Sequence, residues 1–228
     1  SFWLIVPVLL FILISGKSFA DYGLNLTYNW RKSVHFGFWA LIIASLFQGS
    51  GFMIWDKMGI PGFFILMLLL TISIVLLLFV LRNKSETIRV DWKIAIMSAM
   101  IILPCIIAIV NHKNLSQILE NQFYYMVWVG FGEELFYRGY IQSRLNHAWG
   151  RPWKICGIQF GTGLILASIL FGLSHIYRGI GTPLNILLGI GACFAGLFFG
   201  LLREKTDALT AGTIAHGLFG ASRVFGML

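Results

Sequence analysis

The chain has 228 residues, of which 58% are hydrophobic and only 11% are charged, and its formal net charge is +8. Because about a quarter of the residues of an ordinary soluble domain are charged, this composition excludes a soluble globular protein. The Lys and Arg residues lie mainly between apolar runs, where such residues contact lipid head groups and orient a protein in the membrane. We therefore expect membrane lipid as a partner and no nucleic acid.

Apolar runs follow one another along the whole chain. Since about 20 apolar residues cross the hydrocarbon core, the runs predict an all-α, polytopic integral membrane protein of about eight transmembrane helices. We interpret residues 1–228 as a single membrane domain. The expected helices are residues 2–16, 34–55, 60–81, 92–110, 117–147, 157–176, 184–202 and 208–226.

Two of these runs have features of their own. The first ends near the small residue Ala20, as a signal peptide does, but no basic segment precedes its apolar core, so we expect a transmembrane helix. In the seventh run, Gly196 and Gly200 are four residues apart. This spacing permits close packing of one helix against another, and we expect it to act within the chain.

Ionisable groups inside a membrane span cost on the order of 2.5 to 3.5 kcal/mol each and so need a partner or a function, and five of them stand out in the predicted spans. They are Glu133, Glu134 and Arg138 in the fifth run, His175 at the end of the sixth and His216 in the eighth. An acidic pair and two histidines in apolar helices indicate a functional site.

The spacing of these groups suggests different tasks for the two carboxylates. Glu134 and Arg138 are four residues apart, so they share a helix face and should form a structural ion pair. Glu133 lies about 100° further around the helix, so it faces another neighbour and suits a general base. Phe171 precedes His175 by four residues, which places its ring beside the imidazole.

Three motifs carry a family resemblance. Residues 133–138 read EExxxR, residues 171–175 read FxxxH, and His216 opens a third element in the last run. This order resembles the CAAX protease and bacteriocin-processing (CPBP) family, which includes the Rce1-type CAAX prenyl endopeptidases and bacterial proteins linked to peptide processing or bacteriocin immunity. The resemblance covers about residues 117–226, which we take as the catalytic core.

The resemblance implies an intramembrane endopeptidase that cleaves membrane-associated peptides or CAAX-type proteins, with a hydrophobic or lipidated substrate. It implies that Glu133 activates water with the help of His175, that His216 helps to hold the oxyanion, and that Glu134 and Arg138 brace the helix. We expect the protein in a membrane, with the bacterial plasma membrane favoured.

The chain departs from the family at one position. The family's third motif usually has Asn or Asp four residues after its His, and here that residue is Gly220. If that side chain completes the oxyanion hole, its loss costs roughly 3 to 4 kcal/mol of transition-state stabilisation, unless Ser222, a backbone amide or ordered water replaces it. A non-catalytic membrane scaffold or bacteriocin-immunity protein is therefore the alternative function.

Two further alternatives stay open. Glu133, His175 and His216 form a donor set suited to zinc with an open position for water, although no HExxH pair accompanies them. We therefore prefer a metal-free glutamate mechanism, with zinc as the cofactor if one is present. A proton-coupled transporter is disfavoured, because the ionisable groups gather in the C-terminal half and no internal repeat is evident.

Overall fold

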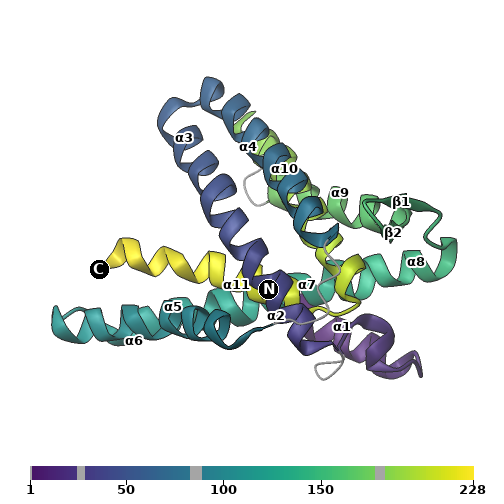
Figure 1. Cartoon of the computed structure of the whole chain (residues 1–228), viewed down its shortest axis with the longest axis horizontal. Helices are drawn as coiled ribbons and strands as arrows, with labels where there is room; N and C mark the ends of the chain where they lie inside the picture. Colours follow the sequence, from purple (N-terminus) through teal and green to yellow (C-terminus); the bar gives the residue numbers. More distant parts are fainter. Residues whose placement is uncertain (1, 25–28, 83–88, 178–182) are drawn as a thin grey trace.

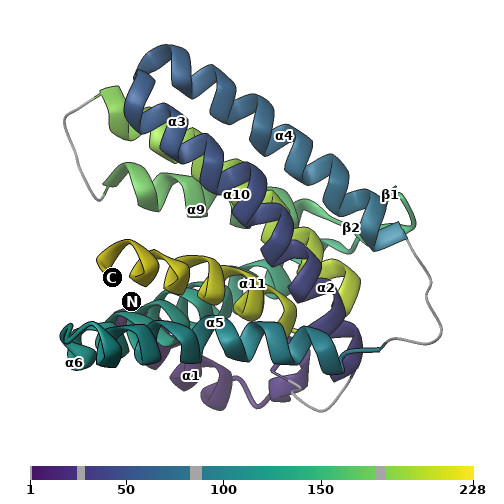
Figure 2. The same cartoon turned by 60° about the vertical axis from the view of Figure 1, so that its left-hand side comes forward.

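Helices form most of the chain in the computed structural model, which describes residues 2–24, 29–82, 89–177 and 183–228 (Figures 1 and 2). For residues 2–4, 177, 183 and 184 only the backbone is described. The α-helices are α1 Phe2–Ile14, α2 Trp30–Ile43, α3 Ser50–Met58, α4 Ile60–Arg82, α5 Asp91–Val110, α6 Leu115–Phe123, α7 Gly132–Glu134, α8 Ser143–Trp149, α9 Thr162–Tyr177, α10 Pro183–Thr206 and α11 Thr210–Ala221. Short 3₁₀-helices are η1 Phe19–Tyr22 and η5 Ser222–Met227, and π-helical segments are η2 Ala44–Gly49, η3 Tyr124–Phe131 and η4 Leu135–Gln142.

Within the described residues, four helices are long and apolar enough to cross a membrane, namely Trp30–Met58, Ile60–Arg82, Asp91–Val110 and Asn185–Thr206. They match four of the predicted runs, and the chain is a polytopic integral membrane protein. Two shorter apolar helices, Ile5–Ile14 and Thr162–Ile176, match two more. The predicted count of eight spans is not confirmed, because several runs contain a shorter helix or carry buried charges.

The prediction that the sixth helix begins at residue 157 is wrong. Strands β1 Trp153–Ile155 and β2 Ile158–Phe160 form an antiparallel hairpin, in which Trp153 pairs with Phe160. Between them, Cys156 and Gly157 have φ angles of 48° and 82°. Two successive residues of positive φ make the tight turn whose twist suits a hairpin, so the helix begins only at Thr162.

The acidic pair lies in a long helix whose winding changes twice. From Leu115 to Trp149 the chain is helical throughout, with the π-helical segments η3 and η4 on either side of α7. π-Helical turns are rare and occur mostly at functional sites. The three residues of α7 include Glu133 and Glu134, so both carboxylates lie between two such segments.

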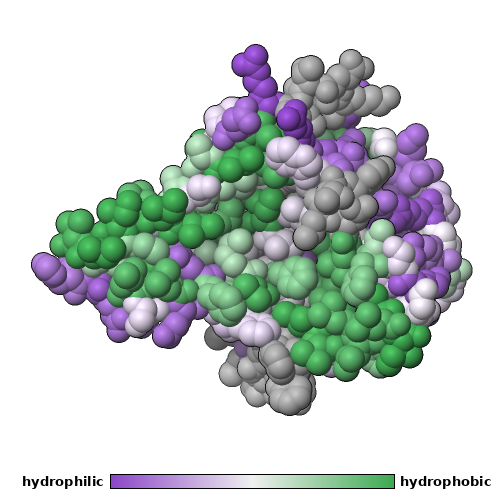
Figure 3. Space-filling model, turned by 90° about the horizontal axis from the view of Figure 1, so that it is seen from below, coloured by the Kyte–Doolittle hydropathy of each residue, from purple (hydrophilic) through white to green (hydrophobic). Residues whose placement is uncertain are grey.

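Much of the outer surface is apolar. Figure 3 shows broad hydrophobic areas, with hydrophilic side chains gathered toward the edges of that face. On α4, Phe64 and Phe79 are 69% and 75% exposed, and on α5 Val110 is 68% exposed. Large apolar side chains exposed to this degree are stable in lipid, so α4 and α5 supply part of the lipid-facing surface.

Glycines bring α9 and α10 close together. A Cβ atom built on Gly196 would lie 2.8 Å from the Cα atom of Ser168, and one on Gly200 would overlap the side chain of Leu164. A Cβ atom on Gly172 would overlap Cys193 in the same way. The predicted packing of Gly196 and Gly200 within the chain is therefore confirmed, and it places the first half of α9 against the second half of α10.

Candidate active site

A contact between two glycines brings α11 against the long helix that carries the acidic pair. A Cβ atom built on Gly130 would lie 2.6 Å from the Cα atom of Gly217. A Cβ atom on Gly212 would lie 2.5 Å from Oε2 of Glu134. Backbones approach this closely only where no side chain intervenes. The residue before Gly217, His216, is thereby held beside the carboxylates.

His216 contacts both members of the acidic pair. Its Nδ1 lies 3.1 Å from Oε1 of Glu134, and its Nε2 lies 3.9 Å from Oε2 of Glu133. Both glutamates are 1% exposed. The ring of Phe199 stacks on the imidazole, with centroids 4.7 Å apart and planes 15° from parallel. Because a carboxylate accepts hydrogen bonds, Glu134 orients His216 with a proton on Nδ1 and Nε2 facing Glu133.

Arg138 balances the charge of the buried carboxylates. Its Nη1 lies 3.2 Å from Oε1 of Glu134, so the predicted ion pair is confirmed. Nη2 donates to the backbone oxygen of Gly196 at 3.2 Å, and the guanidinium carbon lies 4.5 Å from the ring centroid of Phe171. The guanidinium is 1% exposed and connects the long helix to α9 and α10, so it fixes the acidic pair relative to both.

His175 belongs to the same group of side chains through Phe171. The two ring centroids are 4.6 Å apart, which confirms the expected neighbourhood. Nδ1 of His175 lies 2.8 Å from the backbone oxygen of Phe171. A carbonyl oxygen only accepts, so Nδ1 carries the proton and the lone pair of the neutral imidazole is on Nε2. The ring of Phe171 also lies 6.0 Å from that of His216, between the two histidines.

Both histidines line one cavity of about 1010 Å³. Its wall is formed by residues of the span Trp30–Met58 and of α9, α10, α11 and η5. Among them are Gln48, Trp55, Asp56, Asn185, Phe199, Phe219 and Arg223. Glu133 and Glu134 do not line it, and His216 connects them to it through its contacts with both. The arrangement combines buried carboxylates, two imidazoles and an aromatic wall, and these groups are suited to hydrolysis by an activated water.

The part of the chain that carries this geometry also matches a known family. Residues 116–222 match the family model described as Type II CAAX prenyl endopeptidase Rce1-like. These residues form an Rce1-like domain of the CPBP family. No curated protein and no solved structure gives a significant match to the chain. The Rce1-like domain includes all three motifs. The span Trp30–Met58, which also lines the cavity, lies outside it.

Several residues of the Rce1-like domain and of the cavity were not predicted as site residues from the sequence. Phe199, which stacks on His216, looks like any aromatic residue of an apolar run. Gln48 is 1% exposed and donates from Nε2 to the hydroxyl of Ser73 at 3.2 Å. An amide in the middle of an apolar run was a usable signal for it. Arg223, the cation of the eighth run, was another.

At Gly220, where the resemblance implies Asn or Asp, another side chain fills the space. A Cβ atom built on Gly220 would lie 2.7 Å from Cδ1 of Tyr125. Tyr125 comes from η3 of the long helix, so its ring occupies the volume that an Asn or Asp side chain at position 220 needs. Ser222, one candidate for a replacement donor, gives its hydroxyl proton to the backbone oxygen of Phe219 at 2.7 Å.

The donor set that the sequence suggested for zinc is not assembled as a metal site. Among the residues that the structure describes, no three His, Cys, Asp or Glu side chains lie together in a way that could hold a metal ion. Glu133 and His216 are close, but within the described ranges no third such side chain joins them. The residues as arranged do not fit the metal, and we derive no chemical step through it.

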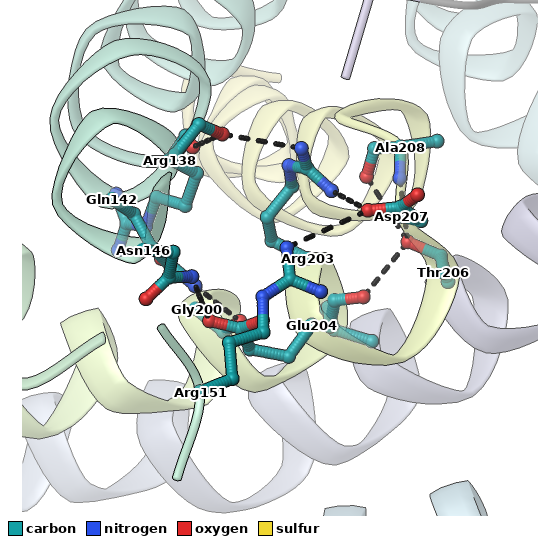
Figure 4. Close-up of polar contacts among 12 residues, drawn as sticks. Arg138, Gln142, Asn146, Arg151, Gly200, Arg203, Glu204, Thr206, Asp207 and Ala208 are labelled. Atoms are coloured by element: carbon teal, nitrogen blue, oxygen red, sulfur yellow. Dashed lines mark hydrogen bonds and ion pairs between the residues drawn. The ribbon is translucent and has the colours of Figure 1, made fainter. Parts of the chain in front are cut away.

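A second polar cluster lies near the other end of the long helix (Figure 4). Oε1 of Glu204 accepts hydrogen bonds from Gln142 at 2.8 Å and Asn146 at 2.7 Å, and Oε2 lies 3.0 Å from Nε of Arg151. Arg203 donates to Asp207 at 2.8 Å on the same side. The buried carboxylate of Glu204 thus links α8, α10 and the segment before the hairpin, and it holds the long helix in place at a distance from the histidines.

Proposed function

We propose that the protein is an intramembrane endopeptidase that hydrolyses peptide bonds of membrane-associated peptides or CAAX-type proteins. The observation that carries the proposal is the position of His216, which contacts both carboxylates of the EExxxR motif and lines the cavity. The match to the Rce1-like family supports the reaction class. The same proposal includes a hydrophobic or lipidated substrate, which the aromatic wall of the cavity suits, and a bacterial plasma membrane as the location.

In the proposed reaction, Glu133 accepts a proton from water, and the hydroxide attacks the carbonyl carbon of the scissile bond. The separation of 3.9 Å between Oε2 of Glu133 and Nε2 of His216 is too long for a direct hydrogen bond and suits a water bonded to both. The tetrahedral intermediate then releases the amine, which takes the proton from Glu133 as the C–N bond breaks. The immediate products are a carboxylic acid and an amine, and the acid then passes its proton to the amine to give a carboxylate and an ammonium group.

His216 and His175 assist at the carbonyl oxygen and at the water. With Nδ1 held by Glu134, His216 directs Nε2 toward the carbonyl oxygen, where a proton on Nε2 stabilises the charge that develops. His175, whose Nδ1 is held by Phe171, presents Nε2 as an acceptor that helps to orient the water. Glu134 and Arg138 act as positioning residues, because they touch His216 and the helix rather than the substrate.

Cleavage of a library of lipid-tethered peptides by the purified protein in lipid nanodiscs tests this function. We expect Glu133→Gln, which keeps the shape of the side chain, to lower kcat by about 10² to 10⁴-fold, since it removes the general base. Glu120→Gln is the matched control, because Glu120 is an exposed glutamate of the same long helix.

Two results would defeat the proposal. Equal cleavage by the wild type and Glu133→Gln would exclude the general base, and no cleavage by a folded wild-type protein would favour a non-catalytic scaffold or a bacteriocin-immunity protein. Folding of each variant is checked by its thermal unfolding midpoint.

A further inference from the structure

One cation lies in the wall of the cavity. Among the described residues that line the cavity, Arg223 is the only Lys or Arg, and Asp56 of α3 is the only carboxylate. Arg223 is exposed and forms no ion pair with a carboxylate in the described parts of the chain. The guanidinium therefore offers a full positive charge to a ligand of the cavity.

Tyr125 holds this guanidinium. Nη1 of Arg223 donates to the Tyr125 hydroxyl at 3.4 Å, and the guanidinium carbon lies 5.5 Å from the centre of the ring. The same ring packs against Gly220, one turn beyond His216. A neutral partner of this kind limits the motion of the side chain without neutralising its charge. The Arg223 side chain is thus held in place before a ligand binds, and its remaining N–H groups can donate to an anion.

The spacing along the helix relates this cation to the reacting centre. Arg223 follows His216 by seven residues, most of them in α11 and the last two in the 3₁₀-helix η5. At 1.5 to 2.0 Å per residue, the separation along the axis is about 11 Å. An extended peptide rises about 3.3 Å per residue, so three residues span it. Phe219 lines the cavity between the two, which favours apolar residues in that stretch of a bound peptide.

We propose that Arg223 is a specificity-determining residue that binds a carboxylate of the substrate about three residues from the scissile bond. The inference rests on the proposed function for the place of the scissile bond. A planar guanidinium binds a carboxylate through two parallel hydrogen bonds, which gives orientation as well as affinity. The carboxylate is either the C-terminus of the substrate or an acidic side chain.

Direct binding tests the proposal without requiring cleavage. Three fluorescent peptides share an apolar sequence and differ in the last residue, which has a free C-terminal carboxylate, a C-terminal amide, or an amide combined with an Asp side chain. Fluorescence anisotropy in nanodiscs gives the Kd of each for the wild type. We expect the free carboxylate to bind about tenfold or more tightly than the simple amide, as a charged hydrogen bond predicts. The third peptide shows which source of carboxylate is accepted.

The variants assign that preference to one side chain. Arg223→Gln should bind the free carboxylate as weakly as the amide and leave the Kd of the amide peptide unchanged. Arg223→Lys should restore part of the preference. Lys57→Gln removes an equal charge from an exposed residue that does not line the cavity, and it should keep the wild-type ratio.

Equal binding of carboxylate and amide by the wild type, or a preference that survives Arg223→Gln, would overturn the proposal. The proposed function fails by a different result, the absence of Glu133-dependent cleavage of the same peptides.

Discussion

Nδ1 of His216 lies 3.1 Å from Oε1 of Glu134, and the same oxygen lies 3.2 Å from Nη1 of Arg138. One carboxylate oxygen therefore connects an imidazole on α11 with a guanidinium on its own helix. Both glutamates of the motif are buried, but they have different neighbours, and only Glu133 faces Nε2 of His216. This difference supports the proposal that the two adjacent glutamates have different roles.

The first prediction concerns Glu134. Replacing it by Gln leaves Arg138 buried without its charge partner, which should lower the free energy of unfolding by about 3 to 5 kcal/mol. The neutral amide also holds Nδ1 of His216 less firmly than the carboxylate does, so kcat should fall by about 10 to 100-fold. Thermal unfolding and peptide cleavage measure the two effects. A variant with wild-type activity would show that Glu134 does not orient His216.

The glycine contact provides a second prediction. Gly130→Ala places a methyl group against the backbone of Gly217, and overpacking of this kind costs about 1 to 3 kcal/mol. The helices must separate, so His216 moves from the carboxylates and kcat should fall more than the affinity for substrate. Gly226→Ala is the control, because a Cβ atom there meets nothing within 4 Å. Unchanged kcat in Gly130→Ala would contradict this account.

The polar cluster around Glu204 is expected to support stability and not chemistry. In Glu204→Gln, an amide faces the donors of Gln142 and Asn146 and no longer attracts Arg151. The cost of leaving buried donors unsatisfied is about 1 to 3 kcal/mol, so the unfolding midpoint should fall while kcat stays within about twofold. Glu120→Gln again serves as the control. A large loss of kcat with unchanged stability would place this cluster in the reaction instead.

A fourth prediction concerns metal. Because the described His and acidic residues do not assemble a metal site, treatment of the purified protein with a strong chelator should leave cleavage within about twofold of the untreated rate. Elemental analysis of the same sample measures its zinc content. One zinc per chain, with activity lost to the chelator and restored by zinc, would establish the metal-dependent alternative.

The sequence predicts the parts of the fold that depend on local composition. The apolar runs at 60–81 and 92–110 end within about a residue of α4 and α5, since few polar residues interrupt a true span. The hairpin was missed because Cys156 gives no turn signal by itself, and its positive φ depends on the following Gly157. The number of spans also escapes prediction, because an apolar run does not reveal whether its helix reaches across the bilayer.

In the candidate site too, local contacts could be predicted from the sequence and long-range contacts could not. The ion pair of Glu134 with Arg138 follows from a spacing of four along one helix. The contact of Glu134 with His216 joins residues 82 positions apart, and no local pattern encodes it. It depends on where Gly130 and Gly217 meet, and the sequence contains 25 glycines from which that pair cannot be chosen. The π-helical segments around Glu133 are equally invisible in the sequence, although they decide which way the carboxylate points.

The two π-helical segments make the register of the long helix as important as its composition. Each π-helical turn holds one residue more than an α-helical turn, so deleting a single residue within η3 would restore regular winding there. Because that turn would then cover the same rotation with one residue fewer, the residues on either side of η3 would keep their orientation. A deletion in the regular turns of α6 has no wide turn to absorb it and would rotate the residues before it by about 100° relative to the carboxylates. Where the length of this helix changes is therefore as important as which residues it contains.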